Sequence, residues 1–269
     1  MPNAPIYQLL PGVYADKEAL GAAAARDIGD ALTRRLASQP GVRVIFASAP
    51  SQEATLRHLA KHPGIDWARV TAFHMDEYLG LAPDAPQRFG TWLRRALFDH
   101  VPVGAVHLIE GGHLIEGGHL IEPEHPTDRG ADPRAVADSY AALLAAAPID
   151  LVCLGIGDNG HLAFNDPPAD LHDPALVKVV TLDQASRVQQ VDDGCFAALH
   201  EVPTRAVTLT IPALLAGAEL FCMAPGARKK RAVSDALYGP VTGLMPASAL
   251  RTHPRCRLYL DKESAPDVS

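Results

Sequence analysis

The chain has 269 residues, of which 48% are hydrophobic and 20% charged, and this composition is ordinary for one folded globular domain spanning residues 1–269. Its formal net charge of -7 provides no broad basic surface for nucleic acid or for an anionic membrane, so neither is expected as a partner. The four cysteines show no Cys-x-x-Cys spacing, which argues against a zinc site or a disulfide framework.

The N-terminal segment, Met1 to Pro11, lacks a basic stretch followed by an apolar one. The chain also contains no apolar run of about 18 residues, the length that a membrane-spanning helix requires. We therefore expect a cytoplasmic protein.

Predicted helices and strands alternate along most of the chain. Residues 17–38 have apolar positions at three- and four-residue spacing and predict a helix, and the β-branched residues 42–47 predict a strand. The alternation continues through residues 52–62, 69–74, 89–100, 105–109, 131–147, 149–155, 206–210, 219–224, 227–238 and 257–260. This pattern predicts an α/β fold with a mostly parallel, Rossmann-like sheet and helices on both faces.

Ligands of such sheets bind in the loops that follow the carboxyl ends of the strands. The loops in question are residues 48–51, 74–78, 158–166 and 226–229. We expect the functional residues to lie in these loops.

One segment departs from the alternation. A six-residue unit that begins at His107 recurs at His113 and begins again at His119. Histidines at this spacing suggest metal binding, but a period of six matches neither a helix nor a simple strand. The paired glycines favour an enlarged surface loop that arose by duplication.

The segment from Gly155 to Pro167 carries three glycines directly after a predicted strand. Gly155, Gly157 and Gly160 permit a tight turn with exposed backbone amides, and His161 lies where that turn ends. A dinucleotide site would place such a pattern in the first strand-turn-helix unit of the chain, whereas this one lies in the middle. We therefore do not interpret it as a dinucleotide site.

Two adjacent carboxylates, Asp76 and Glu77, follow another predicted strand. Neighbouring side chains on an extended backbone point in different directions, so one carboxylate at most is expected to face a ligand. A helix N-cap is the alternative role for the pair.

Four motifs then carry a family resemblance. They are residues 75–78, 155–165, 186–188 and 226–229. In this order they resemble the glucosamine-6-phosphate deaminase family, over about residues 40–262. The related 6-phosphogluconolactonases share the fold but continue differently after the histidine, so residues 162–165 favour the deaminase branch.

The resemblance implies conversion of glucosamine 6-phosphate to fructose 6-phosphate with release of ammonia, without a metal or organic cofactor. It implies that His161 opens the sugar ring and that Asp76 transfers the proton between C2 and C1. Asn159 stands where the family commonly has an aspartate beside the histidine, so we expect a less basic His161. Asp166 replaces the usual glutamate of the ring-opening group, and its side chain is one methylene shorter.

The resemblance also implies a phosphate site at Arg187 and Lys229, with the loop that begins at Ser48 completing it. This loop departs from the family pattern, because Pro50 removes one amide donor. The expected substrate- and phosphate-binding residues are Ser48, Ser51, Gln52, Glu77, Arg187 and Lys229.

These departures leave alternatives open. The protein is expected to act on a phosphorylated amino sugar, glucosamine 6-phosphate first among them, and it is a possible homo-oligomer. The alternatives are a phosphogluconolactone hydrolase and a non-catalytic sugar-phosphate sensor. Residues 168–177 show no clear match to the allosteric residues of regulated family members, so allosteric activation is not expected.

Overall fold

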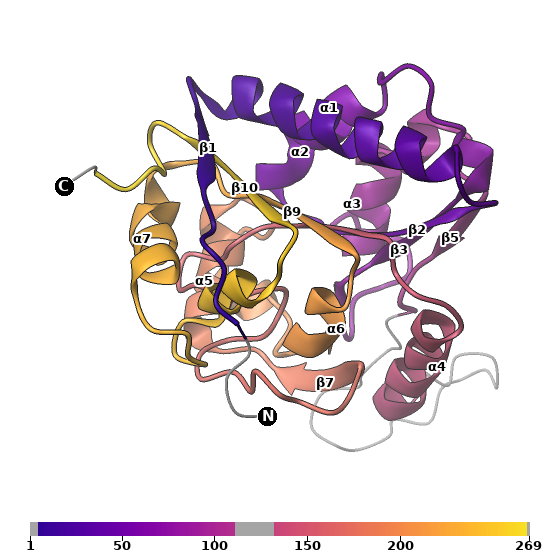
Figure 1. Cartoon of the computed structure of the whole chain (residues 1–269). Coiled ribbons are helices and arrows are strands. Elements are labelled where there is room, and N and C mark those ends of the chain that lie inside the picture. Colours follow the sequence, from indigo (N-terminus) through magenta and orange to yellow (C-terminus); the bar gives the residue numbers. More distant parts are fainter. Residues whose placement is uncertain (1–4, 111–131, 268–269) are drawn as a thin grey trace, which may run out of the picture.

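The main feature of the computed structural model, which describes residues 5–110 and 132–267, is a seven-stranded sheet (Figure 1). All of its paired strands run parallel. In spatial order the strands are β1 (Pro11–Tyr14), β10 (Cys256–Asp261), β9 (Glu219–Met223), β6 (Leu151–Leu154), β2 (Val42–Phe46), β3 (Val70–His74) and β5 (Ala105–His107). The predicted α/β fold with a mostly parallel sheet is therefore confirmed.

A second, three-stranded sheet is antiparallel. Its strands, in spatial order, are β4 (Asp76–Tyr78), β8 (Arg205–Leu209) and β7 (Val177–Thr181). The predicted strand at residues 206–210 thus belongs to this sheet and not to the parallel one, and the expected loop at residues 74–78 contains β4. An apolar run predicts a strand but does not identify its partner, because pairing depends on residues far away in the chain.

Helices cover both faces of the large sheet. Successive residues of β2 point to opposite faces, so Val44 packs with the helices of one face and Ile45 with those of the other. The first face carries α1 (Lys17–Leu36), α2 (Glu53–Leu59) and α3 (Phe89–Ala96), and the second carries α4 (Pro133–Ala145), α6 (Ile211–Leu215) and α7 (Lys230–Tyr238). In Figure 1, α1 and α2 lie above the sheet, whereas α4 and α6 lie below it with β7.

The remaining helices are mostly short. The α-helix α5 (Gln184–Asp192) begins at Asp183, whose carboxylate accepts the Ser186 backbone N–H at 2.7 Å as an N-cap. Single-turn or slightly longer 3₁₀ helices occupy Pro50–Gln52, Trp67–Arg69, Phe98–His100, Leu199–Glu201, Ala227–Lys229 and Pro246–Thr252.

An aromatic cluster joins the small sheet to the glycine-rich loop. The Tyr78 ring of β4 lies 4.7 Å from Phe89 at the start of α3 and 5.4 Å from Phe164, measured between ring centroids. All three side chains are buried. Because Phe164 follows His161 by three residues, this cluster fixes the histidine loop against β4.

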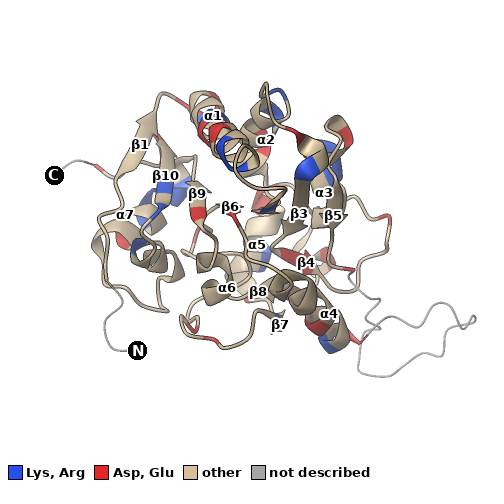
Figure 2. Ribbon diagram, turned by 45° about the vertical axis from the view of Figure 1, so that its right-hand side comes forward, with Lys and Arg blue, Asp and Glu red and all other residues tan. Residues whose placement is uncertain are grey.

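Charges of both signs are mixed along the surface helices, as the alternating blue and red segments of α1 show (Figure 2). Within residues 5–110 and 132–267, no helix is both long and apolar enough to cross a membrane. The six-residue repeat that begins at His107 falls mostly at residues 111–122, which lie outside the described residues.

Candidate active site

A cavity of about 390 Å³ opens where several strands of the large sheet end. Residues 47–52 after β2, 155–157 after β6 and 225–229 after β9 all contribute to its wall. Of the residues expected from the sequence, those that line it are Ser48, Ser51, Gln52, Asp76, His161 and Lys229. The loops at the carboxyl ends of the strands therefore converge as expected.

Two glycines of the histidine loop have distinct structural roles. A Cβ atom on Gly157 would lie 2.2 Å from Cε1 of the His161 ring, so only glycine allows the ring to pack there. Gly160 has a φ of 86°, in the left-handed region that favours glycine. The turn that these glycines permit directs the His161 side chain into the cavity.

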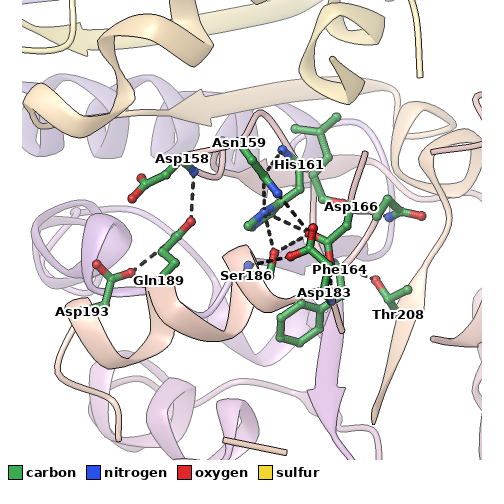
Figure 3. Close-up of polar contacts among 12 residues, drawn as sticks. Asp158, Asn159, His161, Phe164, Asp166, Asp183, Ser186, Gln189, Asp193 and Thr208 are labelled. Carbon is green, nitrogen blue, oxygen red and sulfur yellow. Dashed lines mark hydrogen bonds and ion pairs between the residues drawn. The ribbon is translucent and has the colours of Figure 1, made fainter. Parts of the chain in front are cut away.

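The His161 ring is held from its Nδ1 side (Figure 3). The side-chain oxygen of Asn159 lies 2.8 Å from Nδ1 and also accepts the His161 backbone N–H at 3.0 Å. The Ser186 hydroxyl lies 3.2 Å from Nδ1, and the Asp166 carboxylate lies 3.4 Å from it. Since Asn159 Oδ1 is the nearest acceptor, Nδ1 carries the ring proton and Nε2 is left as the basic nitrogen.

Asp166 belongs to the same hydrogen-bond network as Asn159, Ser186 and His161. Its carboxylate accepts a hydrogen bond from the Ser186 hydroxyl and one of 3.4 Å from the Asn159 side-chain amide. The shorter side chain therefore still reaches the histidine group, although Asp166 does not itself line the cavity.

Burial lowers the pKa of His161, and nearby Lys229 lowers it further, whereas Asp166 opposes both effects. Burial is the main cause of this decrease, and the expected effect of Asn159 on the basicity of His161 stays a prediction. The imidazole is therefore neutral near pH 7 and available as a base.

Asp76 lies on β4, opposite Thr208 of β8, and only 6% of its surface is exposed. Burial raises the pKa of Asp76 well above its ordinary value, and the neighbouring Glu77 carboxylate adds to the increase. A carboxyl group with raised proton affinity at a cavity wall suits proton transfer to and from carbon.

Glu77, in contrast, points away from the cavity and is fully buried. Its carboxylate accepts the backbone N–H groups of Tyr78, Phe89 and Gly90, each at 3.0 Å, and lies 3.6 Å from the Arg88 guanidinium. It therefore anchors the start of α3 to β4, and its expected contact with the substrate stays a prediction. The alternative role in helix capping describes Glu77 better.

The loop after β2 offers hydroxyl and amide groups to the cavity. The Ser48 side chain is 7% exposed, and its oxygen has no hydrogen-bond partner among the described residues. The Gln52 side-chain amide donates to the Ser51 hydroxyl at 3.1 Å and to the Met223 carbonyl at 3.3 Å. These groups form a polar wall in which Pro50 contributes no N–H.

Lys229 is buried and lines the same cavity, and its ammonium lies 2.5 Å from the Asp158 carboxylate. The turn before it depends on Gly226, which has a φ of 97° and donates its N–H to the Asp261 carboxylate. The Lys229 ammonium is thus positioned by the turn after β9 and by its ion pair with Asp158.

Arg187 does not line the cavity. Its guanidinium donates to the backbone carbonyls of Leu199 at 2.8 Å and Val202 at 2.9 Å. These bonds hold α5 against the segment before β8. Arg187 thus lies outside the cavity in this arrangement, and its expected contact with phosphate stays a prediction.

The structure adds cavity residues that the sequence did not indicate. They are Lys17, Gln189, Gln190, Asp193, Arg228, Asp261 and Glu263. The sequence could have indicated Arg228, because it directly precedes Lys229 in the motif at residues 226–229. Lys17 carries no local signal because it lies at the start of a surface helix far from every motif.

Among the described residues, no group of three or more histidine, cysteine, aspartate or glutamate side chains is placed to hold a metal ion. Four cysteines are free. The cavity residues offer hydroxyl, amide, ammonium, guanidinium, carboxyl and imidazole groups to a ligand.

Comparisons with known proteins identify the family of the chain. The glucosamine-6-phosphate deaminase of Arthrobacter sp. (strain FB24) is 32% identical over 264 residues, covering 96% of this chain and 90% of the relative. The glucosamine-6-phosphate deaminase of Exiguobacterium sibiricum is 33% identical over 208 residues, covering 75% of this chain and 71% of the relative.

Solved structures share the fold. A monomeric glucosamine-6-phosphate deaminase aligns with a TM-score of 0.80 at 24% identity, covering 95% of this chain and 98% of that one. The 6-phosphogluconolactonase of Trypanosoma brucei aligns with a TM-score of 0.72 at 20% identity, covering 96% and 98%. The profile of the family described as glucosamine-6-phosphate isomerases/6-phosphogluconolactonase matches residues 15–258, and the chain belongs to this family.

Proposed function

We propose that this protein converts glucosamine 6-phosphate and water to fructose 6-phosphate and ammonia. The observation that carries the proposal is the arrangement of one cavity, in which buried Asp76, the basic nitrogen of His161 and buried Lys229 face the same space. Curated relatives covering most of the chain are named for this deamination.

Ring opening is the first step, and it requires transfer of a proton from the anomeric hydroxyl to the ring oxygen. His161 Nε2 accepts the proton and returns it, while Asn159 keeps the other ring nitrogen protonated and oriented. The lowered pKa of His161 keeps the imidazole in its basic form at neutral pH.

Isomerisation follows in the open-chain aldehyde. The Asp76 carboxylate removes the proton from C2 and delivers it to C1, while the aldehyde oxygen at C1 gains a proton and the amine at C2 loses one. The product is an imine at C2 with a hydroxyl at C1, and water hydrolyses this imine to the ketone and ammonia. The raised pKa of Asp76 allows the carboxyl group to hold the proton between these two transfers.

The phosphate group needs cationic and hydrogen-bonding partners at the far end of the sugar. Lys229 supplies a charge, and the hydroxyls of Ser48 and Ser51 with the amide of Gln52 supply polar contacts. A local site of this kind binds a dianion even though the whole protein is acidic.

An ammonia-release assay with purified protein tests the proposal over a panel that includes glucosamine 6-phosphate, galactosamine 6-phosphate and 6-phosphogluconolactone. We expect ammonia from glucosamine 6-phosphate, and its loss in Asp76→Asn. Asp84→Asn is the matched control, because Asp84 is exposed and lies outside the cavity. Lactone hydrolysis without ammonia would identify a lactonase, and binding without any turnover would identify a sensor.

A further inference from the structure

Lys17 lies at the wall of the active-site cavity although it is the first residue of α1. Its ammonium donates to the backbone carbonyl of Pro50 at 2.7 Å. This single bond places the positive charge over the loop that begins at Ser48 and leaves two N–H donors of the ammonium for another acceptor.

Close helix packing explains how the start of α1 reaches this loop. A Cβ atom on Gly21 would lie 2.6 Å from the Cβ of Ala54, so the two helices approach each other where α2 begins. Lys17 is one helical turn before Gly21 and lies on the same face of α1. The packing therefore directs Lys17 to the segment that leads into α2.

The positive N-terminus of α1 is offset by its N-cap, because the Asp16 carboxylate accepts the Ala19 backbone N–H at 2.8 Å. The Glu18 carboxylate binds Arg57 at 2.5 Å and His58 at 2.7 Å. Both carboxylates of this helix end thus have partners other than Lys17, whose ammonium binds the Pro50 carbonyl.

Lys17 also differs from the other two cations of the cavity. The Lys229 ammonium pairs with Asp158, and Arg228 pairs with three aspartates, among them Asp193. Within residues 5–110 and 132–267, no carboxylate lies within ion-pair distance of Lys17. Among the three cations of the cavity, Lys17 is therefore the one whose charge no described carboxylate balances.

Two other residues near Lys17 in the cavity wall also leave hydrogen-bonding capacity unused or missing. The buried Ser48 hydroxyl has no partner among the described residues, and Pro50 lacks the N–H that another residue would offer. Arg187 meanwhile binds backbone carbonyls outside the cavity. We propose that Lys17 is the second cation that binds the substrate phosphate, an inference that rests on the proposed function.

Steady-state kinetics with glucosamine 6-phosphate and thermal denaturation with inorganic phosphate test this role in the parent protein and in Lys17→Ala, Lys17→Arg and Lys61→Ala. Lys61 is the matched control because it is exposed and outside the cavity. In Lys17→Ala we expect KM to rise about tenfold with kcat within about twofold, and stabilisation by phosphate to decrease. Lys17→Arg should restore most of both, and Lys61→Ala should behave as the parent.

The two readouts separate this inference from the proposed function. If the parent releases no ammonia, the proposed function fails, whereas loss of phosphate stabilisation in Lys17→Ala still supports the phosphate contact. An unchanged KM together with unchanged phosphate stabilisation in Lys17→Ala would overturn the inference. A fall in kcat at constant KM would also overturn it, because it would indicate a role in positioning other groups.

Discussion

Replacing Asp76 with asparagine should abolish activity and at the same time stabilise the fold. The carboxyl group is 6% exposed, and burial raises its pKa, so its charged form is disfavoured in the folded protein. A neutral amide costs less to bury, by about 1–3 kcal/mol. Each kcal/mol corresponds to roughly 2–4 °C in the unfolding midpoint of a chain of this size, so we expect an increase of several degrees.

The gain in stability from Asp76→Asn should depend on pH, in a direction that follows from the raised pKa of Asp76. A group whose pKa is raised on folding contributes full stability below its unfolded pKa and loses that contribution as the pH rises through the folded pKa. The advantage of Asp76→Asn should therefore be small in acid and grow toward neutral pH. Ammonia release should fall about 10²- to 10⁴-fold, the usual effect of losing a catalytic base.

Thermal denaturation over a pH series, with an ammonia assay on the same samples, measures both effects. The reasoning fails if Asp76→Asn keeps activity within about tenfold of the parent, since a positioned base contributes more than that. It also fails if the folded variant is less stable than the parent at neutral pH.

Three further substitutions test the other parts of the site. Lys229→Ala should raise KM for glucosamine 6-phosphate about 10- to 100-fold with little change in kcat, and an unchanged KM in steady-state kinetics would exclude phosphate binding there. Glu77→Gln removes a charge that raises the pKa of Asp76, so the acidic limb of the kcat/KM profile should move to lower pH. A shift to higher pH would contradict this effect of the Glu77 charge on Asp76. Asn159→Asp places a carboxylate at the His161 ring and should raise the pKa of the imidazole. An NMR titration of the ring measures this pKa directly, and no increase would refute this account.

Most of the large sheet was predictable, because strands such as β2 and β6 are buried, apolar and separated by helices, whereas the partly exposed edge strand Pro11–Tyr14 was not predicted. The strand at Val42–Phe46 and the helix at Lys17–Leu36 are examples in which local pattern determines the element. The antiparallel sheet was not predictable in the same way. Val177–Thr181 is only partly buried, and its pairing with Arg205–Leu209 joins distant segments for which the local sequence carries no signal.

The same distinction applies to the site. Asp76, His161 and Lys229 lie in motifs at the ends of strands, and the topology of a parallel sheet brings such loops together. Lys17 reaches the cavity only because two helices pack closely, and Arg187 turns away from it because backbone carbonyls compete for its guanidinium. Side-chain direction of this kind depends on tertiary contacts that a motif does not specify.

Product analysis in deuterated water tests the central claim most directly. If Asp76 transfers the proton within this cavity, NMR and an ammonia assay should show fructose 6-phosphate and ammonia formed in equal amounts from glucosamine 6-phosphate, with deuterium at C1 to the extent that the carboxyl proton exchanges with solvent. Both products should form about 10²- to 10⁴-fold more slowly with Asp76→Asn. Turnover of 6-phosphogluconolactone with no ammonia from any hexosamine phosphate would contradict the account.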